Sequence, residues 1–290
     1  MPESPEVEAL AEELDARLTG HALTDVDVLE FRSTKTRARQ PATLVGQSVT
    51  GVTRHGKLID LAFGAQHLVV SLGRHGWARW GGTASADEPG GAVVASDEGT
   101  GPPPALVTLA FDDGSALELT DAGGWVSLGL WVVDRPVEVP AVAKLGPDPA
   151  DPGFSRTDID TAIVGRRKQV KAVLQEQESL AGIGNAYSDE ILHAARISPV
   201  VHASALTTDE LDRLFDATVG VITDAIAARR GVPIAHLKAT KVAAMRVHGR
   251  AGEACPVCGG TVHDFTFAST TAQYCPTCQT NGELLPLRAS

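Results

Sequence analysis

The chain has 290 residues, and its composition of 43% hydrophobic and 21% charged residues is typical of a folded globular protein. No apolar run approaches the roughly 18 residues that a membrane-spanning helix needs. The N-terminal segment MPESPEVEALAEELD is acidic where a secretory signal peptide would be basic and apolar, so we expect a cytoplasmic protein with no membrane partner. The net charge of −11 argues, as an average, against a nucleic-acid binder.

The first predicted element is an amphipathic helix over residues 5–18, because apolar side chains recur there every three or four positions. Ser4 is a suitable N-cap and Pro5 a suitable first helical residue. Residues 23–80 contain short apolar segments separated by glycines, which is typical of an antiparallel sheet or sandwich. Residues 81–105, rich in Gly, Ala, Pro and acids, predict a mobile insertion, after which strands resume.

The second half of the chain changes character twice. Residues 136–153 are rich in proline and predict an interdomain linker. Residues 157–230 have a helical pattern, and the C-terminal segment is rich in Cys, Gly, Pro and Thr. We therefore expect four consecutive parts with the boundaries 1–135, 136–153, 154–244 and 245–290.

Basic residues gather in three stretches despite the acidic average. Residues 31–59 and 226–252 contain no acid, and residues 166–171 contain Arg166, Arg167, Lys168 and Lys171. Such stretches could together line a groove that binds a polyanion, because a polyanion responds to the local field rather than to the net charge of the protein. The alternative is that each stretch is an ordinary solvated face.

Four cysteines near the C-terminus have the spacing of a metal site. Cys255-Pro-Val-Cys258 is followed, after sixteen residues, by Cys275-Pro-Thr-Cys278. Two such turns give the closed tetrahedral set of four sulfur ligands that is typical of structural zinc. We predict one structural Zn²⁺ in a small zinc ribbon. The alternative of two local disulfides does not suit an intracellular protein.

The N-terminus carries a possible reagent. Methionine removal before the small residue Pro2 would leave a secondary amine, and an α-amino group has a pKa near 7.7–8.0, well below that of lysine. A secondary amine adds to an aldehyde-like carbon to form an iminium, which is an electron sink. Glu3 beside it could relay protons. Taken alone, the same residues could have no function.

Five motifs occur in an order and spacing that can be compared with known families. These are MPESPEVEAL, RHGKLIDL, LGPDP, ESLAGIGNAYSDEIL…RISP and CPVC…YCPTC. In this order and spacing the chain resembles the Fpg/Nei family of DNA glycosylases/AP lyases over almost its whole length. The resemblance implies an α+β multidomain fold: an N-terminal antiparallel β-sandwich with a leading helix, a helix–two-turn–helix domain and a C-terminal zinc ribbon. It also implies double-stranded DNA with a damaged base or abasic site as the partner, with the damaged nucleotide flipped out.

The resemblance assigns roles to five residues. Pro2 resembles the nucleophile that attacks the sugar C1′, and Glu3 resembles the acid that assists sugar opening and proton transfer. Glu6 resembles a supporting acid near the helix start, which we group with the DNA-binding residues. Lys57 resembles a catalytic lysine on a β-turn that contacts phosphate near the lesion. Asn185 resembles the residue that holds phosphate at the flipped nucleotide.

The glycines before Asn185 fit the same role on physical grounds. Gly182 and Gly184 let backbone N–H groups approach an anion at the start of the helix that begins near Asn185. The implied reaction is base displacement by Pro2, sugar opening, iminium formation and strand cleavage by β-elimination, with a second elimination to leave a gap. We expect Asp189 and Glu190, further along this helix, to lie on its surface.

Two recognition loops depart from the family pattern. Arg74 stands where the formamidopyrimidine branch has a methionine that fills the hole left by the extruded base. The segment Thr120–Trp125 lacks the arginine that would pair with the orphaned base, although Trp125 could wedge between bases. These changes predict that the opposite-base preference is relaxed or is read by Arg74, and they argue against strict 8-oxoguanine specificity. Oxidised pyrimidines, formamidopyrimidines, bulky adducts and abasic sites remain open as substrates.

A third departure affects phosphate binding. Thr270 stands where a zinc-finger arginine is expected, so one phosphate contact is missing. We predict that Lys238, Lys241 and Arg246 of the second acid-free stretch replace it in part. Lys238, Lys241 and Arg250 are expected to be DNA-binding residues.

The leading prediction is a bifunctional DNA glycosylase/AP lyase that acts as a monomer at the nucleoid of a bacterial-type cell. One alternative is a non-catalytic or lyase-only damaged-DNA-binding protein on the same fold. Another is an unrelated zinc-ribbon protein that binds RNA or protein, which accounts for the C-terminal segment alone.

Overall fold

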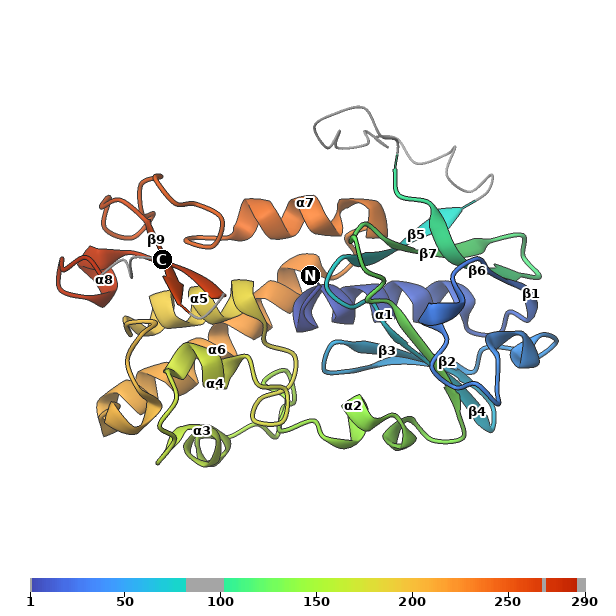
Figure 1. Cartoon of the computed structure of the whole chain (residues 1–290), viewed down its shortest axis with the longest axis horizontal. Helices are drawn as coiled ribbons and strands as arrows, with labels where there is room; N and C mark the ends of the chain where they lie inside the picture. The colour runs from blue at the N-terminus through green and yellow to red at the C-terminus, as the bar shows by residue number, and fades with distance from the viewer. Residues whose placement is uncertain (1, 82–101, 268–269, 286–290) are drawn as a thin grey trace. The chain divides into compact units, whose positions relative to one another are not determined.

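The computed structural model describes residues 2–81, 102–267 and 270–285, and contacts within the chain divide it into two compact units (Figure 1). Unit 1 contains Pro2 and residues 6–143 and 230–237, and unit 2 contains residues 3–5, 144–229 and 238–285. Most of the predicted insertion at 81–105 lies outside the described residues. No helix of the described part is long and apolar enough to cross a membrane.

The leading helix of the chain is α1 (Ser4–Leu18), which belongs to unit 1 from Glu6 onward. Its apolar stripe is fully buried, as the periodicity predicts. The side chains of this stripe are Val7, Leu10, Leu14 and Leu18, all at most 1% exposed.

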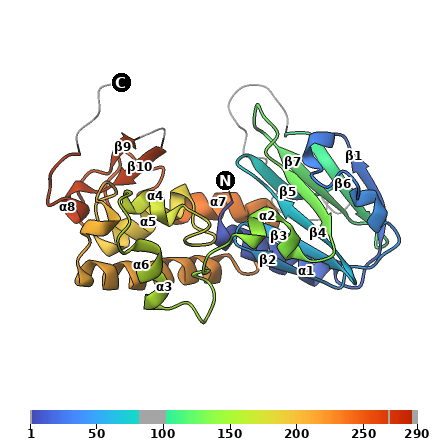
Figure 2. The same cartoon turned by 60° about the horizontal axis from the view of Figure 1, so that its bottom comes forward.

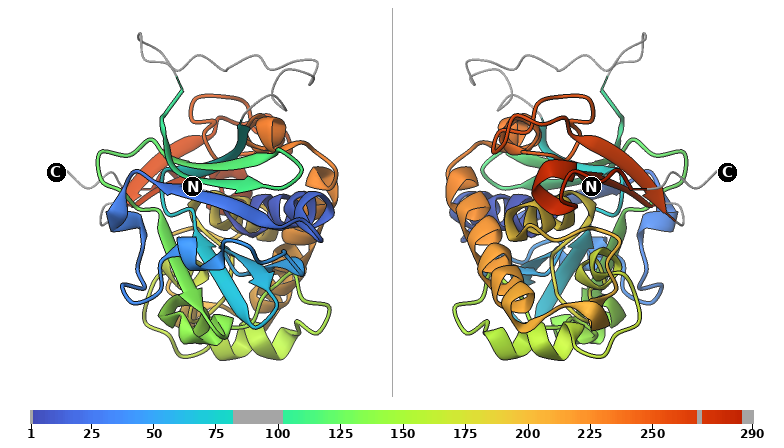
Figure 3. Two further views of the ribbon diagram at one scale, coloured as in Figure 1. Left: turned by 90° about the vertical axis from the view of Figure 1, so that its right-hand side faces the viewer. Right: turned by 90° about the vertical axis from the view of Figure 1, so that its left-hand side faces the viewer.

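Unit 1 is a sandwich of two four-stranded antiparallel sheets, as predicted, and Figure 3 (left) shows one sheet above the other. The first sheet has the order β1 (Leu23–Val28), β6 (Ala105–Phe111), β7 (Ala116–Asp121) and β5 (Gly76–Gly81). The second has the order β2 (Gly51–His55), β3 (Leu58–Phe63), β4 (Gln66–Ser71) and β8 (Gly129–Val133). One apolar core joins α1 to side chains of both sheets, including Leu61, Leu68, Leu109 and Leu119. The short turns η1 (Phe31–Ser33) and η2 (Pro41–Leu44) connect β1 to β2.

Unit 2 is helical and ends in a β-hairpin (Figure 2). Its helices are α3 (Arg156–Ile163), α4 (Val170–Leu174), α5 (Asn185–Ala195), the long α6 (Thr208–Arg229) and the end of α7 (Ile234–Ala244). The hairpin pairs β9 (His263–Phe267) with β10 (Thr270–Tyr274), and the short α8 (Pro276–Gln279) follows. Helix α5 is buried along most of its length, with Ala194 exposed near its end, and its apolar residues belong to the core of this unit.

The predicted interdomain segment 136–153 is divided between the two units. Its first part forms η4 (Pro136–Glu138) and α2 (Pro140–Ala143), both in unit 1. Its second part is bonded into unit 2, because the Gly146 N–H donates to the Gln177 carbonyl and the Pro147 carbonyl accepts from the Ala181 N–H, both at 2.9 Å. The LGPDP motif therefore supports the loop that precedes α5.

Candidate active site and DNA-binding residues

The carboxylate of Glu3 occupies the N-terminal end of α5. Its Oε2 accepts from the Gly184 N–H at 2.5 Å and the Tyr187 N–H at 3.3 Å, and its Oε1 accepts from the Ala186 N–H at 3.0 Å. The ammonium of Lys241 lies 3.4 Å from Oε1. All four groups are donors, so they suit an ionised carboxylate at a helix end where the macrodipole favours negative charge. Pro2, the predicted nucleophile, is buried and directly precedes Glu3 in the chain.

The loop before α5 is built to hold this carboxylate. Gly182 has a φ of +83°, and its backbone carbonyl accepts from the Ser4 N–H at 3.0 Å. The Gln177 side chain fixes the loop from within, since it accepts from the Gly182 N–H and donates to the Ile183 carbonyl. A Cβ on Gly184 would lie 2.6 Å from the Glu3 carboxyl carbon, so only glycine permits the observed approach.

The anion held by the N–H groups at the start of α5 is the carboxylate of Glu3. The DNA contact expected of Gly184 stays a prediction. Asn185 remains suited to phosphate through its side chain. Its Oδ1 accepts from the Gln175 amide at 3.2 Å, and its Nδ2 group has no acceptor within the described ranges. The neighbouring residues thus orient the Asn185 amide with its donors available.

A buried charge cluster lies behind Asn185. The Lys171 ammonium donates to the Asp189 carboxylate at 2.5 Å, to the Ser188 hydroxyl at 3.0 Å and to the Asn185 carbonyl at 3.2 Å. The second oxygen of Asp189 lies 2.8 Å from Nδ1 of His248. Burial lowers the pKa of Lys171, and the charge of Asp189 opposes this shift. The basic stretch 166–171 is therefore partly internal, and its Lys168 also pairs with an acid, Glu176.

The expectation that Asp189 and Glu190 lie on the helix surface is wrong. Asp189 is 1% exposed and Glu190 is 6% exposed. The two Glu190 oxygens accept from the N–H groups of Arg246, Val247 and His248, each at 2.9 Å. An acid pair on the buried part of this helix has no solvated face to occupy, so both acids must find donors inside the protein.

The four cysteines converge as predicted and form a zinc site. Their sulfur atoms all lie within 4.8 Å of one another, with 3.9 Å between Cys255 and Cys278 and 3.4 Å between Cys258 and Cys275. These separations match a tetrahedron with Zn–S distances of about 2.3 Å, whose edges measure about 3.8 Å. The residues therefore fit one structural Zn²⁺ with no open position for substrate.

The zinc ribbon is attached to α5 by polar side chains that sequence reasoning missed. Nε2 of the buried His193 lies 3.3 Å from the Cys255 sulfur. Gln279 donates to the Ile197 carbonyl just beyond α5 at 2.8 Å and accepts from the Cys275 N–H at 2.9 Å. Helix α5 thus carries the Glu3 carboxylate at its start and the zinc ribbon near its end.

Lys57 occupies a tight turn in unit 1. Gly56 and Lys57 form the two-residue loop between β2 and β3, and Gly56 has the positive φ of 58° that such a hairpin turn requires. The Arg54 guanidinium donates to the Gly56 carbonyl at 2.8 Å and pairs with Glu8 of α1 at 2.5 Å. These bonds tie the turn to the leading helix. Glu6, in the first turn of α1, is 1% exposed.

The two predicted recognition loops of unit 1 meet at Ser127. The Ser127 hydroxyl accepts from the Arg74 N–H at 2.9 Å and donates to the Asp121 carboxylate at 2.8 Å. Asp121 also accepts from the N–H groups of Gly123, Ser127 and Leu128. Burial raises the pKa of Asp121, but these bonds outweigh it and lower the pKa below its usual value. Arg74 is exposed, and Trp125 is 84% exposed.

The remaining predicted DNA contacts lie in α7 and just after it. Lys238 and Arg246 are exposed. The guanidinium of Arg250 is already bonded to the Met245 carbonyl at 2.6 Å, the Ala243 carbonyl at 3.3 Å and the Glu253 carboxylate at 2.8 Å. Arg250 therefore fixes the end of α7, and its contact with DNA stays a prediction.

Three domain families match the chain in order. They are the formamidopyrimidine-DNA glycosylase N-terminal domain over residues 1–125, the H2TH domain of the same enzymes over residues 145–234, and a zinc finger found in FPG and IleRS over residues 252–281.

Individual proteins give the same assignment. The chain is 31% identical to a formamidopyrimidine-DNA glycosylase of Mycobacterium sp. (strain KMS), with 96% of this chain and 97% of that protein covered. It is 45% identical, over 146 residues, to a formamidopyrimidine-DNA glycosylase-like protein of Mycobacterium tuberculosis, covering 50% of this chain and 91% of that one. A Lactococcus lactis formamidopyrimidine-DNA glycosylase bound to abasic-site DNA has the same fold, with a TM-score of 0.78, 24% identity and 96% and 99% of the two chains covered.

Proposed function

The chain belongs to the formamidopyrimidine-DNA glycosylase family, and we propose that its Pro2 amine excises a damaged base from DNA and then cleaves the strand. Base excision with an associated lyase step is the activity of this family. The observation that carries the assignment of residues is the fixed carboxylate of Glu3, next to Pro2, at the start of α5.

The proposed reaction begins when the Pro2 nitrogen, freed by loss of Met1, bonds to the sugar C1′ and the base departs. Protonation of the ring oxygen opens the sugar, and the nitrogen and C1′ then form an iminium cation. Loss of the 2′ proton to a base allows the C3′–oxygen bond to break, which cuts the strand. Because its hydrogen-bond partners are donors, Glu3 begins the reaction as an ionised carboxylate. It then accepts a proton and later returns it.

We propose a different role for Lys241 from the phosphate contact expected from the sequence. Its ammonium lies 3.4 Å from Glu3 and 5.0 Å from the centroid of the Tyr187 ring, and its side chain is 14% exposed. A cation in this position balances the charge of Glu3 and limits its movement. Lys241 is thus proposed as a positioning residue for Glu3.

Recognition of the lesion is proposed to rest on the two loops joined at Ser127. Arg74 and Trp125 are exposed on these loops and free to enter the base stack, which supports a relaxed opposite-base preference. Lys57 and Asn185 are proposed to hold the phosphates near the flipped nucleotide. We further propose that the protein acts as a monomer, in the cytoplasm and at the nucleoid.

Borohydride trapping on a duplex with one abasic site tests this function. The protein with a free Pro2, verified by intact mass, should give a covalent protein–DNA band on a denaturing gel. Pro2→Gly should trap far less efficiently, and a chain extended at the N-terminus should not trap. Binding of the abasic duplex without any band from the free-proline protein would instead indicate the damage-binding alternative. A panel of lesions and opposite bases then identifies the substrate.

A further inference from the structure

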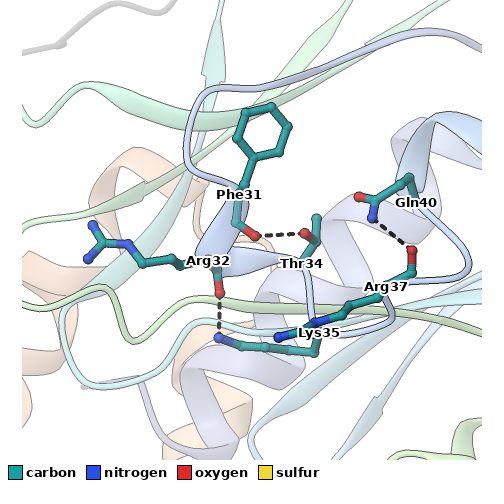
Figure 4. Close-up of a pocket in the computed structure, with 6 residues that line it drawn as sticks. All are labelled: Phe31, Arg32, Thr34, Lys35, Arg37 and Gln40. Carbon is teal, nitrogen blue, oxygen red and sulfur yellow. Dashed lines mark hydrogen bonds between the residues drawn. The ribbon is translucent and has the colours of Figure 1, made fainter.

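The acid-free stretch of residues 31–59 forms a pocket that the proposed reaction does not use. It has a volume of about 540 Å³ and lies entirely within unit 1, in η1 and the loop before η2 (Figure 4). Its lining consists of Phe31, Arg32, Thr34, Lys35, Arg37 and Gln40, three of which are cations and none of which is an acid.

The pocket presents an exposed aromatic ring on a well-bonded turn. Phe31 is 74% exposed. Its carbonyl accepts from the Thr34 hydroxyl at 2.7 Å, and the fully buried Ser33 donates to the Glu30 carbonyl at 2.6 Å. The Lys35 N–H donates to the Leu130 carbonyl of β8 at 2.8 Å. The ring contributes little to the core, yet these bonds fix the backbone that carries it, and such preorganisation lowers the cost of making a contact.

Some cations of this stretch are paired with acids, and others are not. Arg32 is paired with Glu30, Arg39 with Asp134 and Arg54 with Glu8. Two further cations, Lys35 and Arg37, make no ion pair within 4.0 Å in the described part of the chain, although the charge of Lys35 helps to lower the pKa of Glu30, and both line the pocket.

Within the pocket, the local bonds orient the cations. The Lys35 ammonium donates one bond to the Arg32 carbonyl at 2.6 Å and retains two N–H groups for an anion. Figure 4 shows the Arg32 side chain leading away from the Lys35 ammonium, and the Arg32 guanidinium pairs with Glu30 at 2.7 Å. The free positive charge of the pocket therefore comes from Lys35 and Arg37.

We infer that this pocket binds an unstacked nucleotide of single-stranded DNA, with the phosphate on Lys35 and Arg37 and the base on the ring of Phe31. Stacking of bases on aromatic side chains beside cations is how proteins bind single strands without sequence preference. A base within an intact duplex has both faces covered and cannot stack on Phe31. The site therefore favours DNA with a single-stranded segment. This inference rests on the proposed function for the choice of DNA, but it concerns a second site.

Fluorescence anisotropy with a short oligothymidylate and with an intact duplex tests the inference. Phe31→Ala should weaken single-strand binding about tenfold, as expected for loss of one base–aromatic stack, and leave duplex binding unchanged. Phe31→Trp should restore it. Lys35→Ala combined with Arg37→Ala should flatten the salt slope for the single strand by about 1.4. Leu29→Ala is the matched control, because Leu29 is 66% exposed and outside the pocket.

Unchanged single-strand binding in both pocket variants would overturn the inference. So would equally effective competition by thymidine monophosphate, which would make a free nucleotide the ligand. Borohydride trapping on the abasic duplex is measured for the same proteins. Normal trapping combined with lost single-strand binding supports a separate site. Failure of the native protein to trap would count against the proposed function and leave the binding comparison valid.

Discussion

The start of α5 and the pair of loops joined at Ser127 both present functional groups, but they are built differently. At α5, Glu3 is buried and held by three backbone donors, with a buried Lys171–Asp189 pair behind Asn185. At the loops, Arg74 and Trp125 are exposed, and one carboxylate, Asp121, organises the turns beneath them. The group proposed for the chemistry is buried and bonded, whereas the groups proposed for lesion recognition are exposed to solvent.

This difference indicates where the protein can change. A substitution at the start of α5 alters the reaction, because misplacement of a reacting group by about 1 Å can cost a hundredfold in rate. If Arg74 and Trp125 recognise the lesion as proposed, a substitution at either should alter which bases fit more than it alters the rate of the reaction. Two of the three departures from the family pattern fall on the loops and the third, Thr270, falls in the zinc ribbon, whereas the residues at the helix start match the pattern. The following experiments disturb the two regions in turn.

Removal of zinc should have the largest effect. Structural zinc sites contribute on the order of 10 kcal/mol to the folding of their domains. Chelation, or Cys258→Ser, should unfold the ribbon, release His193 and Gln279 from their partners and weaken DNA binding. Calorimetry with parallel metal analysis measures the change. An unaltered Tm in fully zinc-free protein would show that the ribbon does not stabilise α5.

Asp189→Asn should destabilise the protein by roughly 3–5 kcal/mol, because it leaves Lys171 buried without its counter-charge. The loss should lessen as the pH rises, since Lys171 already has a lowered pKa and its neutral amine tolerates burial. Urea unfolding at several pH values measures this. Asp224→Asn on the exposed face of α6 is the control. Equal stability of the two variants would contradict the importance of the buried pair.

Gly184→Ala should reduce the single-turnover cleavage rate about a hundredfold, because the added Cβ displaces the Glu3 carboxylate. Affinity for an abasic-site analogue should change little. Gly220→Ala provides a matched control, because that glycine lies in α6 with open space around it. A normal cleavage rate in Gly184→Ala would show that catalysis does not depend on the observed position of the Glu3 carboxylate.

Lys241→Met distinguishes a positioning role from a phosphate contact. Loss of a cation beside Glu3 should move the acidic limb of the pH–rate profile upward by about one unit, and Lys241→Arg should restore it. Loss of a phosphate contact would instead flatten the salt slope of duplex binding by about one. Lys144→Met, at an exposed lysine with a surface partner, is the control. A changed salt slope with an unchanged pH profile would refute the positioning role.

Asp121→Asn should have the smallest effect on catalysis and a visible effect on selectivity. Because the pKa of Asp121 is lowered, its carboxylate stabilises the loops fully at pH values above its ordinary pKa near 4. This stabilisation is lost as the pH falls through the lowered pKa. The variant should trap abasic DNA within a fewfold of the native rate but discriminate less between opposite bases. Trapping with each of the four opposite bases measures both quantities.

Much of the fold follows from the sequence, because local patterns determine it. The leading helix, the antiparallel sandwich and the cysteine pairs all depend on periodicity or spacing over short distances. The α5 network does not, since Glu3 and Gly184 are 181 residues apart in the chain. A buried acid looks the same in a sequence as a solvated one. The buried state of Asp189 and Glu190 could be inferred only from the lack of a polar face on α5.

The exposure of Trp125 gives the molecule an intrinsic optical reporter. Trp77 is 9% exposed and Trp125 is 84% exposed, so the two indoles sit in environments of very different polarity. Trp80 and Trp131 are half-buried, so the emission at the longest wavelengths should come mainly from Trp125, while emission from Trp77 reports the sandwich core. Entry of the loop into a base stack would quench the first without disturbing the second. The kinetics of lesion search can therefore be followed in unlabelled protein.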